Sequence, residues 1–304
     1  MNPKISICIP AYKQADKLEK LLHSIENQTY RDFEVIVTDD SPNDEVRDLC
    51  LMGFNFPLFY YKNSEIKGSP DNWNEAISYA NGDWIKLVHH DDYFNSNIAL
   101  QEFLTMSEEY PQIEYFFCAT NILDSKSGEQ FPYVVNLDHV NRISEFPAFL
   151  FHKNLIGAPS TSFFKRSVGS KYDKKLIWLV DIEYYNRIIQ SYKIKFIDKY
   201  LITTVISNEQ LTTALKNNKE FEIKEFLYCY KKHIHEFNSL NKKIMRHRLI
   251  DLFDEFNINN SRELRSLSLI SDVPFFAKLF LCCKSLNSAI ARRLFYKLNH
   301  FKIP

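Results

Sequence analysis

The sequence has little glycine, and the few glycines do not form a phosphate-binding loop. Only Gly53, Gly68 and Gly82 occur among the first 90 residues, and neither G-x-G-x-x-G nor G-x-x-x-x-G-K-[ST] is present. Without these motifs the chain does not match dinucleotide-binding Rossmann enzymes or P-loop NTPases. A bound nucleoside diphosphate would instead need basic side chains, or a divalent cation held by carboxylates, to neutralise its charge.

Other absences exclude further classes of protein. Lys plus Arg equal Asp plus Glu at 38 each, so no overall positive field indicates nucleic acid as a partner. The six cysteines show no C-x-x-C spacing, which favours a reducing compartment over a disulfide scaffold. No signal-peptide pattern and no apolar run of the roughly 18 residues that span a membrane are present. We therefore expect a cytoplasmic protein.

Strand-like runs alternate with amphipathic helical patterns over the first 120 residues. The periodicity predicts strands over 4–10, 33–40, 56–61, 83–92 and 113–120, and helices over 15–28, 69–82 and 97–110. Strict alternation predicts a mostly parallel sheet with helices on both faces. The pattern weakens between about 124 and 173, a helix and a strand follow over 175–198, and helices are predicted over 219–240 and 242–256.

Acidic residues follow two of these strands. Asp39 and Asp40 end the second strand, and Asp91 and Asp92 end the fourth. In parallel sheets ligands bind beyond the carboxyl ends of the strands, so two carboxylate pairs at one edge favour a site over a polar turn or helix cap. Carboxylate oxygens suit Mg²⁺ or Mn²⁺. The neighbouring histidines are a weaker zinc signal, because consecutive strand residues point to opposite faces.

At this point the sequence resembles a known family. The stretches "ISICIPAYKQADKLEKLLHSIENQTYRDFEVIVTDDSPND" and "GSPDNWNEAISYANGDWIKLVHHDDYF" are similar to the family 2 glycosyltransferases of GT-A fold. The resemblance covers residues 4 to about 125 closely and continues loosely to about 215. Each motif alone is weak, but their order and spacing are specific.

The resemblance implies an α/β, GT-A nucleotide-diphospho-sugar transferase fold with a mostly parallel central sheet, flanking helices and a helical C-terminal extension. The expected boundaries are 1–217 for the catalytic domain and 218–304 for the extension. Within the catalytic domain, 1–123 would form the nucleotide-binding half and 124–217 the acceptor half.

The resemblance also assigns site residues. The residues that it implies for the nucleotide-sugar are Pro10, Tyr12, Asp39, Asp40, Asn74, His90 and Asp91. A divalent cation, Mn²⁺ or Mg²⁺, would be held by Asp91 with His89 and Asp92. His89 stands where the family keeps the first acid of its D-x-D-D motif, and Lys13 stands where Asn is usual.

Asp181 is the expected catalytic base. The family carries this base as the Asp of an E-D motif with an Arg six residues on, and "WLVDIEYYNRII" offers Asp181 with Arg187, although Val180 replaces the Glu. Inverting transfer needs such a carboxylate to take the proton of the acceptor hydroxyl. The alternative is that Asp181 is only an acid favoured by the helix dipole. Glu183 is then the second candidate.

The expected function is metal-assisted, inverting transfer from a nucleotide-sugar, expected to be a UDP-sugar, to a hydroxyl of a glycan or lipid-linked acceptor. Relatives of this kind build bacterial surface polysaccharide, lipopolysaccharide or O-antigen. Two alternatives stay open. One is a catalytically silent relative that binds nucleotide or scaffolds a glycan-assembly complex. The other is a nucleotidyltransferase, which would be expected to carry a glycine-rich basic loop where this chain has "PAYKQAD".

The final residues, 272–304, combine apolar and basic side chains. Their cations, with no acid after Asp272, are Lys278, Lys284, Arg292, Arg293, Lys297 and Lys302. An amphipathic cationic helix suits an anionic membrane surface, so this segment is expected to be a peripheral contact at the inner face of the cell membrane. The alternative is a basic helix that caps the catalytic domain or forms an oligomer contact.

Overall fold

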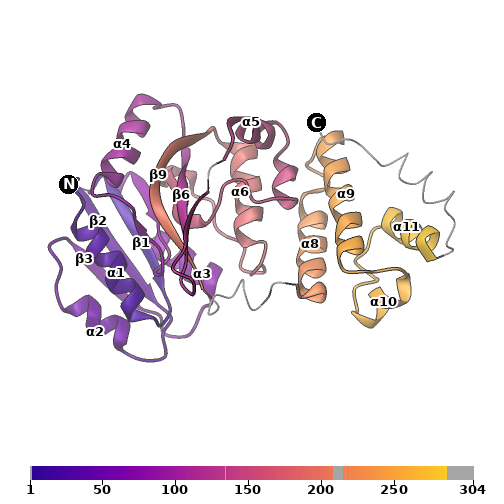
Figure 1. Ribbon diagram of the computed structural model, residues 1–304, viewed down its shortest axis with the longest axis horizontal. Helices are drawn as coiled ribbons and strands as arrows, with labels where there is room; N and C mark the ends of the chain where they lie inside the picture. The colour runs from indigo at the N-terminus through magenta and orange to yellow at the C-terminus, as the bar shows by residue number, and fades with distance from the viewer. Residues whose placement is uncertain (1, 134, 208–214, 216, 286–304) are drawn as a thin grey trace. The chain divides into compact units, whose positions relative to one another are not determined.

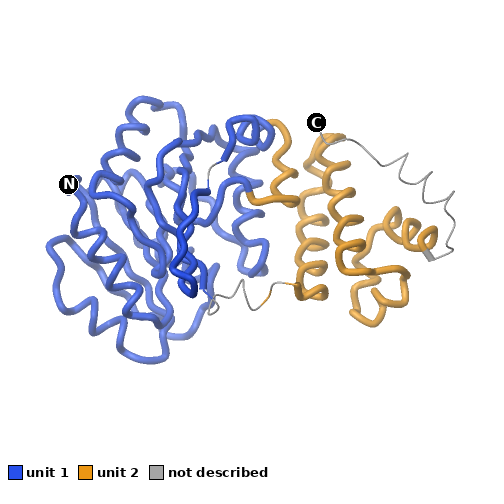
Figure 2. Tube along the Cα trace, in the orientation of Figure 1, with its two compact units in different colours: residues 1–144, 155–210 blue, residues 145–154, 211–304 orange. Residues whose placement is uncertain are grey.

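The computed structural model describes residues 2–133, 135–207, 215 and 217–285. The described chain forms two compact units (Figure 2). The first unit contains residues 1–144 and 155–210, and the second unit contains residues 145–154 and 211–304. The domain boundaries expected at 123 and 217 stay predictions. The short segment 145–154, expected in the acceptor half, is grouped with the second unit.

One sheet of nine strands organises the first unit (Figure 1). The strand order is β3-β2-β1-β4-β8-β6-β9-β5, with β7 paired to β6. The strands are β1 (Ile5–Ala11), β2 (Phe33–Asp39), β3 (Leu58–Lys62), β4 (Trp84–Leu87), β5 (Tyr93–Phe94), β6 (Tyr115–Asp124), β7 (Gln130–Tyr133), β8 (Ser162–Lys165) and β9 (Ile194–Ile206). The first four strands are mutually parallel, as expected, and β6 is parallel to β9, whereas β8 runs antiparallel between β4 and β6.

Helices cover both faces of the parallel part of the sheet. The helices of this unit are α1 (Ala15–Glu26), α2 (Glu45–Leu51), α3 (Ser69–Ser78), α4 (Ala99–Glu109), α5 (Leu137–Glu145) and α6 (Val180–Ser191), with short 3-10 turns η2 (Pro159–Thr161) and η3 (Arg166–Val168). Alternate residues of β1 and β2, such as Ile7 and Val35, share a core with Leu18 and Leu22 of α1. The residues between them, such as Ser6 and Thr38, face α3 or the turn that follows it, so the period of two predicts the two faces correctly.

A close approach of Gly82 to strand β1 fixes the end of α3. The Ser6 hydroxyl donates to Glu34 Oε1 at 2.6 Å and accepts from the Gly82 amide at 2.8 Å. A Cβ added at Gly82 would lie 2.6 Å from the Ser6 amide nitrogen, which no side chain can tolerate. The glycine therefore lets α3 return directly into β4, the strand that leads to the predicted metal ligands.

Two expected elements end earlier than the sequence pattern suggests. The strand predicted over 83–92 ends at Leu87, and the four polar residues after Val88 lie in a turn. The helix predicted over 219–240 ends at His233, because Asn238 caps a new helix by accepting from the amides of Leu240 and Asn241. At Asn238 a polar side chain that binds backbone groups locally therefore overrides the apolar periodicity.

The second unit is helical. It contains η1 (Pro147–Phe151), α8 (Lys219–His233), α9 (Ser239–Glu255), α10 (Ser261–Ser266) and α11 (Phe275–Ser285). Asn218, Asn238 and Asn260 each cap the helix that follows them. The segment η1 packs against α9, where the Ala148 amide donates to Asn241 Oδ1 at 3.0 Å.

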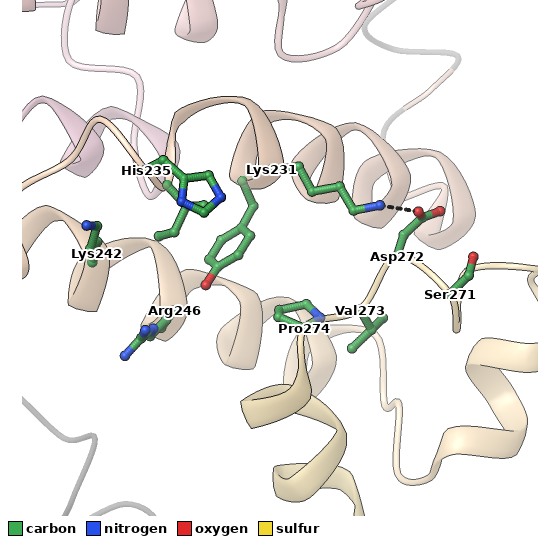
Figure 3. Close-up of a pocket in the computed structure, with 10 residues that line it drawn as sticks. Lys231, His235, Lys242, Arg246, Ser271, Asp272, Val273 and Pro274 are labelled. Atoms are coloured by element: carbon green, nitrogen blue, oxygen red, sulfur yellow. Dashed lines mark hydrogen bonds and ion pairs between the residues drawn. The ribbon is translucent and has the colours of Figure 1, made fainter.

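A cavity of about 540 Å³ lies within the second unit (Figure 3). Its lining includes three cationic side chains, Lys231, Lys242 and Arg246, together with Tyr230 and His235. The ammonium group of Lys231 pairs with Asp272, which comes from the segment before α11. No helix among the described residues is long and apolar enough to cross a membrane.

Candidate active site

The parallel register brings the three polar strand ends together. Ala11 at the end of β1 pairs with Asp39 at the end of β2, and Cys8 of β1 pairs with Leu87 at the end of β4. The ladder continues one step past the strands, since the Asp40 amide donates to Ala11 O at 3.0 Å. The sheet edge predicted from the sequence therefore exists, with Pro10, Tyr12, the Asp39-Asp40 pair and the turn after β4 along it.

Asp39 is buried completely and its carboxylate is fully engaged. Oδ2 accepts from the Tyr60 hydroxyl at 2.8 Å and from Lys62 Nζ at 2.9 Å, while Oδ1 accepts from the Ser41 amide at 2.7 Å. Burial and the bond to Asp39 raise the pKa of the Tyr60 hydroxyl above its usual range, so the tyrosine stays a donor. The Lys62 ammonium compensates the buried negative charge, and Asp39 thereby fixes the chain between β2 and β3.

Asp40 binds the segment that leads into α3. Its Oδ1 accepts from Asn63 Nδ2 at 2.6 Å and from the Lys67 amide at 3.2 Å, and Oδ2 accepts from the Gly68 amide at 2.9 Å. Asp40 is 4% exposed. Asp40 therefore shapes the wall of the edge, and the direct contact with a nucleoside expected for Asp39 and Asp40 stays a prediction.

Asn72 is a residue that sequence analysis did not identify. Its Nδ2 lies 3.2 Å from Ala11 O, and its Oδ1 accepts from Asn63 Nδ2 at 2.9 Å. The residue is buried on the face of α3 that carries Ala76, and an amide on an otherwise apolar helix face was the available signal. Asn72 ties α3 to the end of β1.

Asn74, expected near the nucleoside, binds backbone instead. Its Nδ2 donates to Tyr172 O at 2.9 Å, and its Oδ1 accepts from the Tyr172 amide at 2.8 Å. This two-bond bridge joins α3 to the segment before α6, which belongs to the predicted acceptor half. The expected nucleotide contact of Asn74 is not tested, and the role that the structure displays is positioning.

The loop from β1 to α1 holds two consecutive residues in the left-handed region. Lys13 has φ 56° and Gln14 has φ 52°, a conformation that costs free energy for residues other than glycine, asparagine and aspartate. The Lys13 amide donates to Ser41 Oγ at 2.6 Å, which holds the loop against the end of β2. The preference for Asn at position 13 that the resemblance implies follows from this backbone conformation.

Tyr12 and His90 lie beside this loop. Tyr12 is 43% exposed, which leaves its ring accessible to a planar ligand. The His90 ring lies between Pro10 O, 3.3 Å from Nδ1, and the side-chain amide of Gln14, 3.2 Å from Nε2. Burial lowers the pKa of His90, so a neutral imidazole braces the loop at neutral pH.

His89, Asp91 and Asp92, here called the active-site trio, converge in the turn after β4. One ligand atom from each lies within 4.8 Å of the other two. Asp92 is 3% exposed, and its Oδ1 accepts from the Val205 amide at 2.9 Å. Burial, and then the neighbouring Asp91 carboxylate, raise the pKa of Asp92 well above its usual range. Two carboxylates this close repel each other, and a cation between them would remove that penalty.

The donor set of the active-site trio fits a divalent cation. Burial lowers the pKa of His89 to about 4, so its ring is neutral at pH 7 and can donate a lone pair. His89 Nε2 is buried and has no hydrogen-bond partner among the residues that the structure describes. The ring packs on Trp73 at 4.6 Å, which fixes its plane. One imidazole nitrogen with two carboxylates suits Mn²⁺ well and Mg²⁺ less well, since Mg²⁺ prefers oxygen alone.

Lys86 is the second residue that sequence analysis did not identify. It is fully buried in β4, donates to Ser162 O at 3.2 Å and also donates to Ser160 O. Burial lowers its pKa to about 8, and the Asp92 carboxylate opposes that shift. A lysine inside the apolar run "WIKLV" was the available signal. Its charge lies behind Asp92 and partly compensates the acidic turn.

Asp181 and Glu183, the two candidate bases, lie at the start of α6 and differ in environment. Asp181 is half-buried, and its Oδ1 accepts from the Ile182 amide at 2.8 Å. Glu183 is 0% exposed and forms a two-bond ion pair with Arg187, at 2.8 and 3.0 Å. Arg187 thus pairs with Glu183, while its Nη2 also donates to Lys171 O at 2.6 Å. Of the two acids, Asp181 is the accessible one.

A series of aromatic rings links the active-site trio to α6. His89 contacts Trp73, Trp73 contacts Tyr172 at 5.0 Å edge to face, and Tyr172 stacks on Tyr184 of α6 at 4.0 Å. The hydroxyls of Tyr172 and Tyr184 are buried, which raises the pKa of both. Because rings packed this closely cannot move independently, the predicted metal ligands and the helix of Asp181 are held in one framework.

Comparison with known proteins places the chain among sugar-transferring enzymes. A family model described as Glycosyl transferase family 2 matches residues 6–168. The GalNAc(5)-diNAcBac-PP-undecaprenol beta-1,3-glucosyltransferase of Campylobacter jejuni is 31% identical over 93 residues, which are 30% of this chain and 30% of the relative. That match covers less than a third of either protein.

Two solved structures share the fold over nearly the whole chain. TarS 1–349 of S. aureus in complex with UDP-GlcNAc has a TM-score of 0.67 at 15% identity, covering 98% of this chain and 91% of TarS. The mannosyltransferase PcManGT of Pyrobaculum calidifontis, in complex with GDP-Man and Mn²⁺, has a TM-score of 0.56 at 15% identity, covering 99% and 82%. The α/β fold with a helical C-terminal region that the sequence predicts is confirmed by these matches.

Proposed function

The chain belongs to glycosyl transferase family 2, and from that premise we propose that it moves a sugar from a UDP-sugar to a hydroxyl of a glycan or lipid-linked saccharide. The observation that carries the proposal is the convergence of the active-site trio at the same sheet edge as the Asp39-Asp40 pair. That edge combines a ligand-facing end of a parallel sheet with donors for a hard cation.

The donor nucleoside binds, in this proposal, along the wall made by Pro10, Tyr12 and the Asp39-Asp40 pair. The exposed Tyr12 ring offers a stacking surface, and the loop of Lys13 and Gln14 lies beside it. UDP is preferred as the nucleotide because the TarS structure of the same fold holds UDP-GlcNAc. GDP is the main competitor, since PcManGT holds GDP-Man.

A divalent cation, Mn²⁺ or Mg²⁺, would be held by Asp91 with His89 and Asp92. Bound there, it would neutralise the diphosphate and stabilise it as a leaving group. The Mn²⁺ in PcManGT supports this choice. The Val205 amide holds Asp92 by a hydrogen bond and the buried Lys86 charge attracts the same carboxylate, so the chain presents a preorganised donor set to the ion.

Asp181 acts as the base in this proposal. Its carboxylate takes the proton from the acceptor hydroxyl while that oxygen attacks the anomeric carbon from the face opposite the diphosphate. The new glycosidic bond forms as the bond to the diphosphate oxygen breaks, so the configuration inverts and UDP leaves with the electron pair. The Glu183–Arg187 ion pair holds α6 so that Asp181 faces the acceptor.

The acceptor is proposed to be lipid-linked, in line with the undecaprenol-linked substrate in the name of the Campylobacter relative. Contact with a membrane surface would use α11, where Phe275 is 80% and Leu279 is 47% exposed. Lys284 already pairs with Asp254 at 2.6 Å. Among the described residues of the segment 272–304, Lys278 is therefore the remaining cation. Residues 286–304, where the other predicted cations lie, are outside the described residues.

Calorimetric titration with UDP, GDP and CDP, each with and without Mn²⁺, tests the donor site. We expect UDP to bind and Mn²⁺ to tighten it at least tenfold, with the Mn²⁺ effect lost in Asp91→Ala. Binding of none of the three nucleotides would overturn the proposal. Nucleotide binding without hydrolysis or transfer across a panel of UDP-sugars would instead favour the silent relative.

A further inference from the structure

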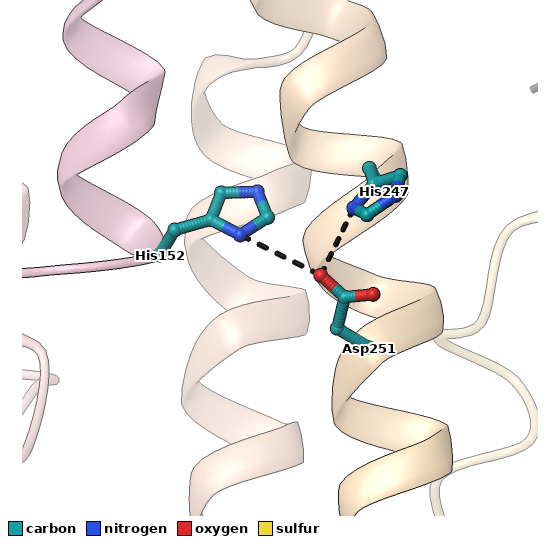
Figure 4. Close-up of side chains that lie close together, drawn as sticks. All are labelled: His152, His247 and Asp251. Carbon is teal, nitrogen blue, oxygen red and sulfur yellow. Dashed lines mark hydrogen bonds and ion pairs between the residues drawn. The ribbon is translucent and has the colours of Figure 1, made fainter. Parts of the chain in front are cut away.

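A second group of metal-ligating side chains lies in the second unit, apart from the proposed active site. His152 follows η1, and His247 and Asp251 lie one turn apart on α9 (Figure 4). One ligand atom from each lies within 4.8 Å of the other two. We call these residues the helical-unit trio. They are mostly buried, with side-chain exposures of 13%, 23% and 33% in the same order.

Hydrogen-bond geometry fixes which nitrogen of His152 carries the proton. Its Nε2 lies 3.2 Å from Ile244 O, and a carbonyl oxygen can only accept, so Nε2 is the protonated nitrogen. Nδ1 of the neutral ring then presents a lone pair. It faces Asp251 Oδ2 at 3.6 Å, which is itself an electron-rich atom. Burial lowers the pKa of His152 to about 4, consistent with the neutral ring at pH 7.

Both histidines face the same carboxylate oxygen. His247 Nδ1 lies 2.9 Å from Asp251 Oδ2, so Figure 4 shows two ring nitrogens directed at one atom. Two ligand atoms each about 2.0 Å from a tetrahedral ion lie roughly 3.3 Å apart, and the distances of 2.9 and 3.6 Å lie on either side of that value. Small side-chain rotations would therefore bring all three donors to one ion.

The surroundings match those of a metal-bound histidine. The bond from His152 Nε2 to Ile244 O is the backbone contact that commonly orients a ligating imidazole. The Ala148 amide bond to Asn241 Oδ1 holds η1 on α9, so the histidine and its two partners are fixed before any ion arrives. His247 and Asp251 share one helix face through their spacing of four residues.

We propose that His152, His247 and Asp251 bind one Zn²⁺ ion, with water completing the coordination. Two imidazole nitrogens and one carboxylate favour a borderline ion such as Zn²⁺ over Mg²⁺ or Mn²⁺. For His247 Nδ1 to bind the ion, the proton between it and Asp251 would move to Nε2 of the same ring. The ion would join the short segment 145–154 to α9 and stabilise the second unit. A proton shared among the three side chains is the competing arrangement.

Zn²⁺ titration of the full-length, chelator-treated protein tests the proposal. Because the active-site trio could also take Zn²⁺, the titration uses the double variant His89→Ala with Asp91→Ala as its background. We expect one Zn²⁺ per chain in this background and at least a tenfold weaker association after adding His152→Ala. The exposed His235 of the same unit supplies the matched control, and His235→Ala should leave the affinity unchanged.

Co²⁺ provides a spectroscopic readout of the coordination geometry. Tetrahedral Co²⁺ with nitrogen and oxygen donors absorbs in the visible range, and this band should disappear in Asp251→Asn, which keeps the size of the side chain. Circular dichroism checks that each variant is folded. No Zn²⁺ binding in the background variant, or binding unaffected by both His152→Ala and Asp251→Asn, would overturn the proposal and favour the shared proton.

Discussion

The two trios use the same residue types in opposite proportion. The active-site trio has one histidine and two aspartates within four consecutive residues of a turn after β4. The helical-unit trio has two histidines and one aspartate, brought together from η1 and α9. The first is rich in oxygen and the second in nitrogen, which are the preferences that separate Mn²⁺ or Mg²⁺ from Zn²⁺.

The supporting structure differs as much as the donors. In the active-site trio burial, and then repulsion by the Asp91 carboxylate, raise the pKa of Asp92. In the helical-unit trio the lone carboxylate accepts from His247 and is held on a helix. A site whose two carboxylates repel until a cation binds suits catalysis, whereas a site with one carboxylate, held between two elements, suits structure. The comparison shows that burial and neighbouring charges, as well as residue types, distinguish the proposed catalytic site from the proposed structural site.

The largest expected difference comes from removing one aspartate from each trio. Asp91→Ala should lower transfer by roughly 10³- to 10⁴-fold, because several kcal/mol of charge stabilisation disappear with the ion. Asp251→Ala should change transfer less than tenfold. Initial rates with a saturating UDP-sugar and Mn²⁺ measure both. Equal losses in the two variants would show that the trios are not functionally distinct.

Asp181→Asn tests the proposed base, which acts on the acceptor. Transfer should fall by roughly 10²- to 10³-fold, since the amide cannot take the proton, while UDP and Mn²⁺ bind as in the unaltered chain. Steady-state kinetics and calorimetry separate the two effects. Unchanged transfer in Asp181→Asn would move the base elsewhere.

Glu183→Gln should mainly lower the stability of the folded protein. It leaves Arg187 without its ionic partner in a largely buried position, at a cost of about 3 kcal/mol in the free energy of unfolding. Urea unfolding followed by circular dichroism measures the loss. A change below about 0.5 kcal/mol would mean that the ion pair is exposed in solution.

The pH dependence of stability compares the two histidines with strongly lowered pKa, His89 and His152. An unfolded histidine titrates near 6.5, whereas the pKa of each of these is about 4 in the folded chain. Between these values only the unfolded chain binds the proton, so stability falls as pH drops from about 6.5 toward 4. Each residue should contribute about 1 to 2 kcal/mol between pH 7 and 5 in metal-free protein.

Single variants show how much each histidine contributes to the dependence of the unfolding free energy on pH. His89→Asn and His152→Gln should each flatten the curve of unfolding free energy against pH, and the double variant should flatten it further. A slope that neither variant changes would show that both rings are protonated in the folded chain at pH 5.

The smallest expected effect concerns the loop beside the active-site trio. Lys13→Asn replaces a lysine at φ 56° by a residue that tolerates this conformation, so stability should rise by about 0.5 kcal/mol. Thermal unfolding of the two proteins measures the change, and Lys126→Asn, in the exposed turn between β6 and β7, is the control. A decrease in stability would show that the Lys13 side chain contributes more than its backbone strain costs.

Periodicity and strand-end chemistry predict the main framework of the first unit. The alternation of strands and helices, the sheet edge and the grouping of His89 with Asp91 and Asp92 all follow from patterns that are local in sequence. The roles of Asp181 and of the nucleoside-binding residues stay predictions. The sequence could not predict hydrogen bonds between residues that lie far apart along the chain. Lys86 binds the carbonyl of Ser160, and Asn72 binds that of Ala11.

The helical-unit trio belongs to the same class of missed features. Nothing in the sequence around His152 indicates that it meets α9, because the contact depends on how η1 packs. The apolar pattern likewise ran through Asn238, where a side-chain cap starts a new helix. Local propensity therefore predicts elements well and their ends or long-range polar contacts poorly.

The buried amine of Lys86 can be used to measure local unfolding of the first unit. An acylating reagent added to the folded protein cannot reach an ammonium group enclosed between β4 and β8, whereas the exposed lysines react at once. Mass spectrometry of the peptide that contains Lys86 would therefore count the molecules in which these strands have separated. Acylation of Lys86 Nζ then measures the opening of the first unit alone, while unfolding of the second unit can be followed by other probes in the same sample.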